Sequence, residues 1–120
     1  MKKSLWTLVL LIPIALQAQT SVPLKDLSFW QNTNKANWQI TGDVQADLAQ
    51  HGVLSLNPGT GILVNMPDKT NKANLISTNE YGDFDASFDF MMAAESNSGF
   101  YLQGRYEIQL MDSWLSLIHI

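Results

Sequence analysis

The stretch from Asn97 to Trp114 alternates apolar and polar side chains, and this period of two constrains the fold more than any other feature of the chain. Successive side chains of a β-strand point to opposite faces, so such alternation is typical of a strand with one buried face. The polar face of this stretch carries Gln103, Arg105, Glu107 and Gln109. That face is therefore either solvated or part of a site that binds a polar ligand.

The rest of the chain follows the same pattern, with short alternating runs separated by Gly, Asn, Asp and Pro and no long run of helical period. The pattern predicts a hairpin with its turn at Gly42-Asp43, and a second turn at Asn57-Pro58-Gly59. Phe84–Met92 alternates most clearly and is predicted as a half-buried strand. Ser98–Asp112 is predicted to hold one or two strands, with a bend at Gly104.

Strands joined by turns, without helices, predict an all-β sandwich of the jelly-roll type in a single domain. Roughly 95 residues remain after the N-terminal leader, enough for about six to eight strands. A two-sheet sandwich with a ligand groove usually has more strands than this. We therefore expect the jelly roll to be truncated.

The N-terminus has the features of a secretory signal peptide. Lys2 and Lys3 precede an apolar run from Leu5 to Leu16, and cleavage is expected after Ala18. A membrane anchor is the alternative, but about a dozen apolar residues are fewer than the ~20 that span a bilayer. We predict that residues 1–18 are removed, that no stable membrane anchor remains, and that the protein is periplasmic or secreted. The chain has no cysteine, so no disulfide is expected.

The charge of the chain argues against nucleic acid as a partner. Without the leader, five Lys and Arg face eleven Asp and Glu, which gives a net charge of −6. Binding to a phosphate backbone relies on clustered basic side chains. Here they are scattered along the sequence, as Lys25, Lys35, Lys69, Lys72 and Arg105. An acidic exported protein is better suited to neutral ligands.

Four blocks occur in a fixed order along the chain: Leu27–Trp30, Asn37–Ile40, Leu75–Phe84 and Asn97–Ser113. Together they resemble the 3-keto-disaccharide hydrolase family, also described as 3-keto-glucoside 1,2-lyase and 3-keto-2-hydroxyglucal hydratase. The resemblance implies a concanavalin A-like lectin/glucanase fold, a carbohydrate substrate, and hydrolase or lyase activity.

The resemblance runs from residue 24 to residue 114, which we interpret as the N-terminal part of a family domain. Family domains continue with a Gly-rich stretch and further strands. This chain instead ends in Leu115–Ile120, which resembles translated adapter sequence. We expect residues 115–120 to be a non-native tail. The alternative is a genuine last strand that is apolar because it is buried.

The implied chemistry depends on the ketone at C3 of the sugar, which acidifies the hydrogen at C2. A base removes that proton, the substituent at C1 leaves by β-elimination, and water adds to the resulting glucal. Such an enzyme needs a base near the C2 proton and a cationic group or metal near the developing enolate oxygen.

Arg105 and Glu107 could meet these needs. Two residues apart on one strand, they would share a face with about 7 Å between their origins. We predict that Arg105 polarises the carbonyl, that Glu107 acts as base or metal ligand, and that Gln103 and Gln109 bind hydroxyl groups. The alternative is a solvated ion pair, which contributes little to stability.

The remaining candidates are less strongly indicated. The family blocks suggest Glu80 and Asn97 as substrate-binding residues, although each could instead support a loop or turn. Asp112 is out of register with residues 105 to 109 and could be a metal ligand or a turn cap. The cofactor is unknown, and a divalent metal such as calcium is the candidate. Trp30, Trp38 and Tyr101 could pack in the core or stack on a sugar.

Two other functions remain open at this point. A non-catalytic glycan-binding jelly roll would share the fold and the polar strand but would need no base. An inactive gene fragment, unable to close its second sheet, would neither cleave a glycan nor bind one.

Overall fold

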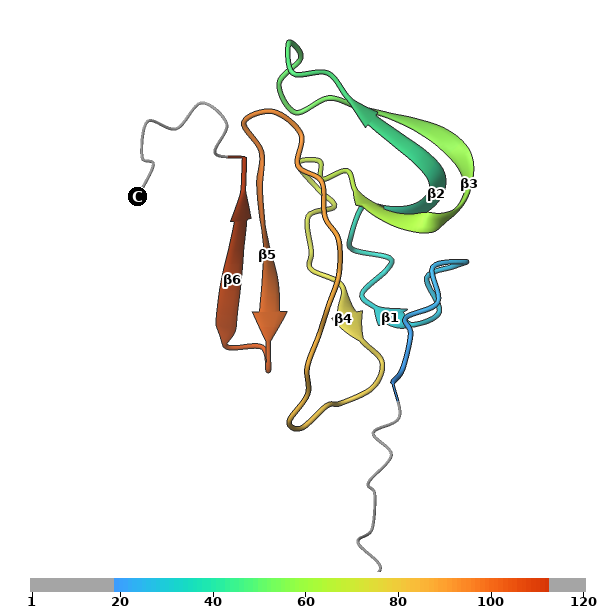
Figure 1. Ribbon diagram of the computed structural model, residues 1–120, viewed down its shortest axis with the longest axis vertical. Helices are drawn as coiled ribbons and strands as arrows, with labels where there is room; N and C mark the ends of the chain where they lie inside the picture. The colour runs from blue at the N-terminus through green and yellow to red at the C-terminus, as the bar shows by residue number, and fades with distance from the viewer. Residues whose placement is uncertain (1–18, 113–120) are drawn as a thin grey trace, which may run out of the picture.

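The computed structural model describes residues 19–112, and the predicted signal peptide and the predicted tail at 115–120 lie outside these residues. The described chain forms six strands: β1 (Trp30–Gln31), β2 (Trp38–Ala46), β3 (Leu54–Asn65), β4 (Ile76–Ser77), β5 (Asn97–Leu102) and β6 (Tyr106–Met111). They form three antiparallel pairs, β1 with β4, β2 with β3, and β5 with β6 (Figure 1). Residues 19–112 contain no helix, so none could cross a membrane.

The all-β prediction is confirmed, and antiparallel pairs of this kind are what part of a jelly roll provides.

The β2–β3 pair is one long curved hairpin, and the two turns predicted within it are wrong. The chain reverses only between Ala46 and Leu54, while Gly42-Asp43 and Asn57-Pro58-Gly59 lie inside the paired strands. There the pairing jumps from Thr41 opposite Ile62 to Asp43 opposite Asn57. The residues that resemble turns therefore form a bulge, a feature that bends a strand without ending it.

Two glycines make this bulge possible. A Cβ on Gly42 would lie 2.9 Å from the Cα of Gly59, and one on Gly59 would lie 2.7 Å from the Cα of Gly42. Gly59 also has a φ of 149°, which disfavours other residues. Thr41, 4% exposed, closes the bulge because its hydroxyl donates a hydrogen bond to the carbonyl of Asn57.

The strand predicted at Phe84–Met92 is also absent. This segment has no ladder of hydrogen bonds, and residues 81–91 are all exposed. It runs beside β5 (Figure 1). The rings of Phe88 and Phe100 lie 4.8 Å apart there. Alternation correctly indicates an extended backbone, but a strand also requires a partner for its backbone groups.

The β5–β6 hairpin pairs in register from Asn97 opposite Met111 to Leu102 opposite Tyr106. Gln103 and Gly104 have φ values of 53° and 63°, and the amide of Arg105 donates to the carbonyl of Leu102 over 3.0 Å. Successive positive φ angles are typical of the tight turns that join hairpin strands. The expected bend at Gly104 is thus a full reversal between two strands.

The core is sparse. The buried apolar residues are Ala36, Val64, Ala93 and Ala94, and no large side chain within 19–112 is fully buried. Several large apolar side chains are instead exposed, including Phe90 at 59% and Ile108 at 49%. Sheet faces that other proteins cover are open in this structure.

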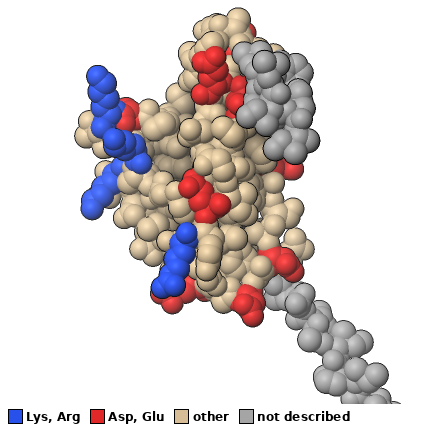
Figure 2. All heavy atoms as spheres, turned by 90° about the vertical axis from the view of Figure 1, so that its left-hand side faces the viewer, with Lys and Arg blue, Asp and Glu red and all other residues tan. Residues whose placement is uncertain are grey.

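Charge is also distributed without a single dominant field. Figure 2 shows acidic side chains scattered from the top to the base of one face, and basic side chains at its left margin and low on the same face. Mixed charge of this kind mainly favours solubility.

Candidate functional site

The hairpin turn divides the row of four polar residues predicted from the sequence. Gln103 and Arg105 lie in the turn, whereas Glu107 and Gln109 lie on β6. The four side chains therefore do not line one strand. The residues opposite Glu107 and Gln109 are instead Tyr101 and Gly99 of β5.

The odd-numbered residues of the two strands share one face of the hairpin, which we call the polar face. Its members are Asn97, Gly99, Tyr101, Glu107, Gln109 and Met111. Opposed residues of antiparallel strands point to the same side, so this follows from the register. On this face the side-chain amide of Gln109 donates to the carbonyl of Ser98 over 2.9 Å.

Glu107 has two neighbours on the polar face. The side chain of Glu107 folds over Gly99. A Cβ added to Gly99 would lie 2.8 Å from both Cγ and Cδ of Glu107. Its carboxylate also faces the hydroxyl of Tyr101, its partner in the strand register, which can donate a hydrogen bond to it. This bond raises the pKa of Tyr101, and desolvation and the negative charge of Glu107 act in the same direction. The polar face thus holds a carboxylate in one orientation while leaving it accessible.

Arg105 is exposed at the end of the turn, two residues before Glu107. Within the described chain no ion pair joins Arg105 to a carboxylate. The contact of this kind found there is between His51 and Glu95. Within residues 19–112 the guanidinium therefore makes no ion pair with Glu107.

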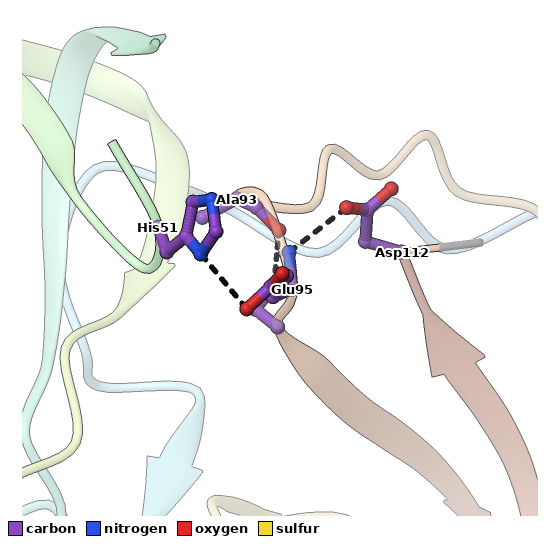
Figure 3. A network of polar contacts seen from close by, with 5 residues as sticks. His51, Ala93, Glu95 and Asp112 are labelled. Atoms are coloured by element: carbon purple, nitrogen blue, oxygen red, sulfur yellow. Dashed lines mark hydrogen bonds and ion pairs between the residues drawn. The ribbon is translucent and has the colours of Figure 1, made fainter. Parts of the chain in front are cut away.

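Asp112 caps a turn, which was one of its two predicted roles. Its Oδ2 accepts a hydrogen bond from the amide of Glu95 over 2.9 Å (Figure 3). Its own amide donates to the carbonyl of Ser96. Glu95 has a φ of 58°, and its Oε2 lies 2.8 Å from Nδ1 of His51. These contacts, with a bond from the amide of Gly52 to the carbonyl of Ala94, tie β6 and this turn to the β2–β3 hairpin.

Within residues 19–112 no three His, Cys, Asp or Glu side chains gather as a metal site would require. Glu80 is exposed in the loop after β4, and Asn97 is exposed at the start of β5. In the part of the chain that is described, the metal prediction therefore rests on single carboxylates, that of Asp112 and, as the alternative to its role as base, that of Glu107.

The aromatic candidates differ in their surroundings. Trp30 and Trp38 are half-buried, and the indole nitrogen of each is buried without a hydrogen-bond partner among the described residues. Tyr101 is 47% exposed on the polar face. The two tryptophans therefore pack against the rest of the protein, whereas the ring of Tyr101 is accessible to solvent.

A shallow hollow of about 280 Å³ lies on the other side of the hairpin. Its lining residues are Gly82, Asp83, Phe84, Leu102, Gln103 and Tyr106. Leu102 and Tyr106 are paired residues of the face opposite Glu107. Gln103, predicted to bind substrate, lines this hollow from the turn, whereas Glu107 lies on the opposite face of the hairpin.

Gly99 and Tyr101 are the residues that sequence reasoning missed as partners of Glu107. A turn at Gln103-Gly104 would have revealed them, because it sets Tyr101 opposite Glu107. The available signal was Gly104 alone, since Gln is not a preferred residue at positive φ.

Comparison with known proteins gives one family. The profile of the 3-keto-alpha-glucoside-1,2-lyase-like domain matches residues 17–116, most of the chain. No curated protein and no solved structure matches.

Proposed function

The chain belongs to the 3-keto-alpha-glucoside-1,2-lyase-like family, and from this premise we propose that it is an exported enzyme that cleaves 3-keto-glycosides. The family supports a carbohydrate-related function in general. The observation that carries the more specific proposal is the accessible Glu107 carboxylate, held over Gly99 by the hydroxyl of Tyr101.

Glu107 is the proposed base. Its carboxylate takes the proton from C2, and the electron pair of that bond forms the enolate. The bond from C1 to the glycosidic oxygen then breaks, and the proton held by Glu107 passes through solvent to that oxygen, which regenerates the carboxylate. Water then adds its hydroxyl group to C1 and returns a proton to C2, which completes a net hydrolysis. A base can act in this way only within hydrogen-bond reach of the proton, and an exposed strand residue allows such an approach.

Arg105 is the proposed electrophilic group. A guanidinium always carries a positive charge, and its N–H donors can stabilise the oxygen at C3 as negative charge develops there. Because no described carboxylate neutralises Arg105, its charge is available for this role.

The other candidates keep the roles proposed for them from the sequence. Gln103, Gln109, Asn97 and Glu80 would bind sugar hydroxyl groups. Asp112 would be the metal ligand if a divalent ion takes part, but we derive no step through a metal because its Oδ2 already caps the turn at Glu95.

The second candidate function is a non-catalytic glycan-binding module. It is favoured by the openness of the polar face, since Tyr101, Glu107 and Gln109 are all exposed. Enzymes usually exclude water from the reacting groups, whereas binding modules tolerate an open surface.

Incubation with 3-keto-trehalose and with trehalose separates these functions. We expect glucose release from 3-keto-trehalose alone, and Glu107→Gln should reduce the rate by roughly 100-fold or more, as the loss of a general base does. Glu95→Gln is the matched control, because Glu95 lies at the distant His51 contact, and it should keep full activity. Binding of the sugar without glucose release would favour the binding module, and full activity of Glu107→Gln would remove Glu107 from the mechanism.

Export is part of the proposal and rests on the N-terminal sequence. We expect the protein recovered from the periplasm or medium of an expressing cell to begin at Gln19, because the leader ends in a small residue at position 18. Intact mass measurement tests this. A secreted fraction that retains residues 1–18, or protein found only in the cytoplasm, would contradict it.

A further inference from the structure

We propose that Gly99 and Tyr101 are positioning residues for Glu107: Tyr101 orients the carboxylate through its hydroxyl, and Gly99 provides the space in which the carboxylate lies. The catalytic part of this inference rests on the proposed function of Glu107 as base. The pairing itself rests on the geometry of the hairpin.

The backbone alone does not require a glycine at position 99. Gly52, Gly59, Gly61 and Gly104 have positive φ among the described glycines, and Gly99 is not one of them. Any residue could adopt its extended conformation. Space is the constraint, because a Cβ at this position would approach Cγ and Cδ of Glu107 to 2.8 Å.

The consequence of filling this space is local. The obstructing atoms belong to a flexible side chain, not to the backbone, so a methyl group at position 99 would displace the carboxylate and leave the strands paired. Gly99→Ala should therefore change where Glu107 points without unfolding the hairpin.

Tyr101 orients the carboxylate of Glu107. It lies opposite Glu107 in the strand register, where side chains directly face one another. The hydrogen bond to Glu107 is the largest cause of the raised pKa of Tyr101, so the hydroxyl remains a protonated donor at neutral pH. A carboxylate with one fixed donor keeps its remaining lone pairs directed at a bound substrate.

A cross-strand pair that only stabilises the hairpin would have the same geometry. The test must therefore separate an effect on the orientation of Glu107 from an effect on the stability of the protein. In Tyr101→Phe we expect kcat for 3-keto-trehalose to fall roughly tenfold or more, the usual effect of losing a hydrogen bond to a charged group, with KM changed less than about twofold. Tyr106→Phe is the control, because Tyr106 is 66% exposed on the opposite face.

Gly99→Ala should lower kcat by up to about 100-fold, since misplacing a catalytic group by about 1 Å can cost this much. Gly82→Ala is its control, because nothing lies within 4 Å of a Cβ there and its φ is not positive. Equal effects of the two glycine variants, or of the two tyrosine variants, would overturn the inference.

A measurement independent of activity completes the test. The 13Cζ resonance of Tyr101, assigned with Tyr101→Phe, is followed by NMR through alkaline pH in the full chain. Glu107→Gln removes both the hydrogen bond to a charged acceptor and the negative charge, so the pKa of Tyr101 should fall towards its ordinary value. Glu95→Gln should leave it unchanged.

The two readouts distinguish the possible failures. An unchanged pKa of Tyr101 in Glu107→Gln would overturn the pairing, whatever the activity. A lowered pKa in a protein that releases no glucose would support the pairing and overturn the proposed function alone.

Discussion

Gln103 occupies the least favourable backbone conformation of the β5–β6 hairpin. Its φ of 53° is in the left-handed region, where a side chain with a Cβ costs roughly 1–2 kcal/mol relative to glycine. Asn tolerates this region better, because its short side chain bonds the local backbone, and Asn-Gly is the preferred pair for such turns. The residue that closes the hairpin is therefore also the one that weakens it.

We predict that Gln103→Asn stabilises the hairpin by about 0.5–1 kcal/mol, which would slow amide exchange of Phe100 and Ile108 roughly two- to fivefold. These residues pair with one another in the middle of the hairpin. NMR hydrogen exchange at neutral pH measures the effect. Gln103→Ala is the comparison, since Ala gains nothing at positive φ. Equal exchange rates in both variants would show that the turn does not limit the opening of the hairpin.

At the scale of single residues, the sequence predicted an exposed polar face and included Glu107 and Gln109 in it. It did not predict that Tyr101 and Gly99 complete that face, because the partner of a strand residue depends on the position of the turn. The chemical roles of Glu107, Arg105, Gln103, Gln109, Asn97, Glu80 and Asp112 stay predictions.

At the scale of elements, alternation predicted extended backbone more reliably than it predicted strands. The β5–β6 hairpin has both alternation and a partner, whereas residues 84–92 have the alternation alone. The β2–β3 hairpin shows the opposite error, since Gly42 and Gly59 produce a bulge where residue types suggested turns. Local residue preferences cannot distinguish a turn from a bulge, because both use glycine to allow close approach or positive φ.

At the scale of the whole molecule, the described residues bury little apolar surface. Four small or medium apolar residues form the core, while Phe88, Phe90, Tyr106 and Ile108 remain between 47% and 66% exposed. Burial of apolar surface is the main contribution that offsets the conformational entropy lost on folding. The prediction of an all-β class was correct because it needed only strand pairs, which are local, whereas a closed sandwich needs contacts between sheets.

We therefore predict that a protein comprising residues 19–120 unfolds over a broad temperature range and binds the dye ANS. Open apolar faces bind this dye, and a sparse core gives little cooperativity. Calorimetry and ANS fluorescence measure the two properties. Ile108→Thr should reduce the dye signal by removing part of an exposed apolar face. A sharp transition that coincides by circular dichroism and tryptophan fluorescence would contradict the prediction.

The contact between Glu107 and Gly99 also has an evolutionary consequence. A side chain at position 99 would push the acid out of the volume that it now occupies, whereas position 107 can become smaller while Gly99 stays. A lineage that keeps the acid in this place should therefore keep glycine at position 99. Lineages with a larger residue at position 99 should be those in which the acid at position 107 has been lost or has moved.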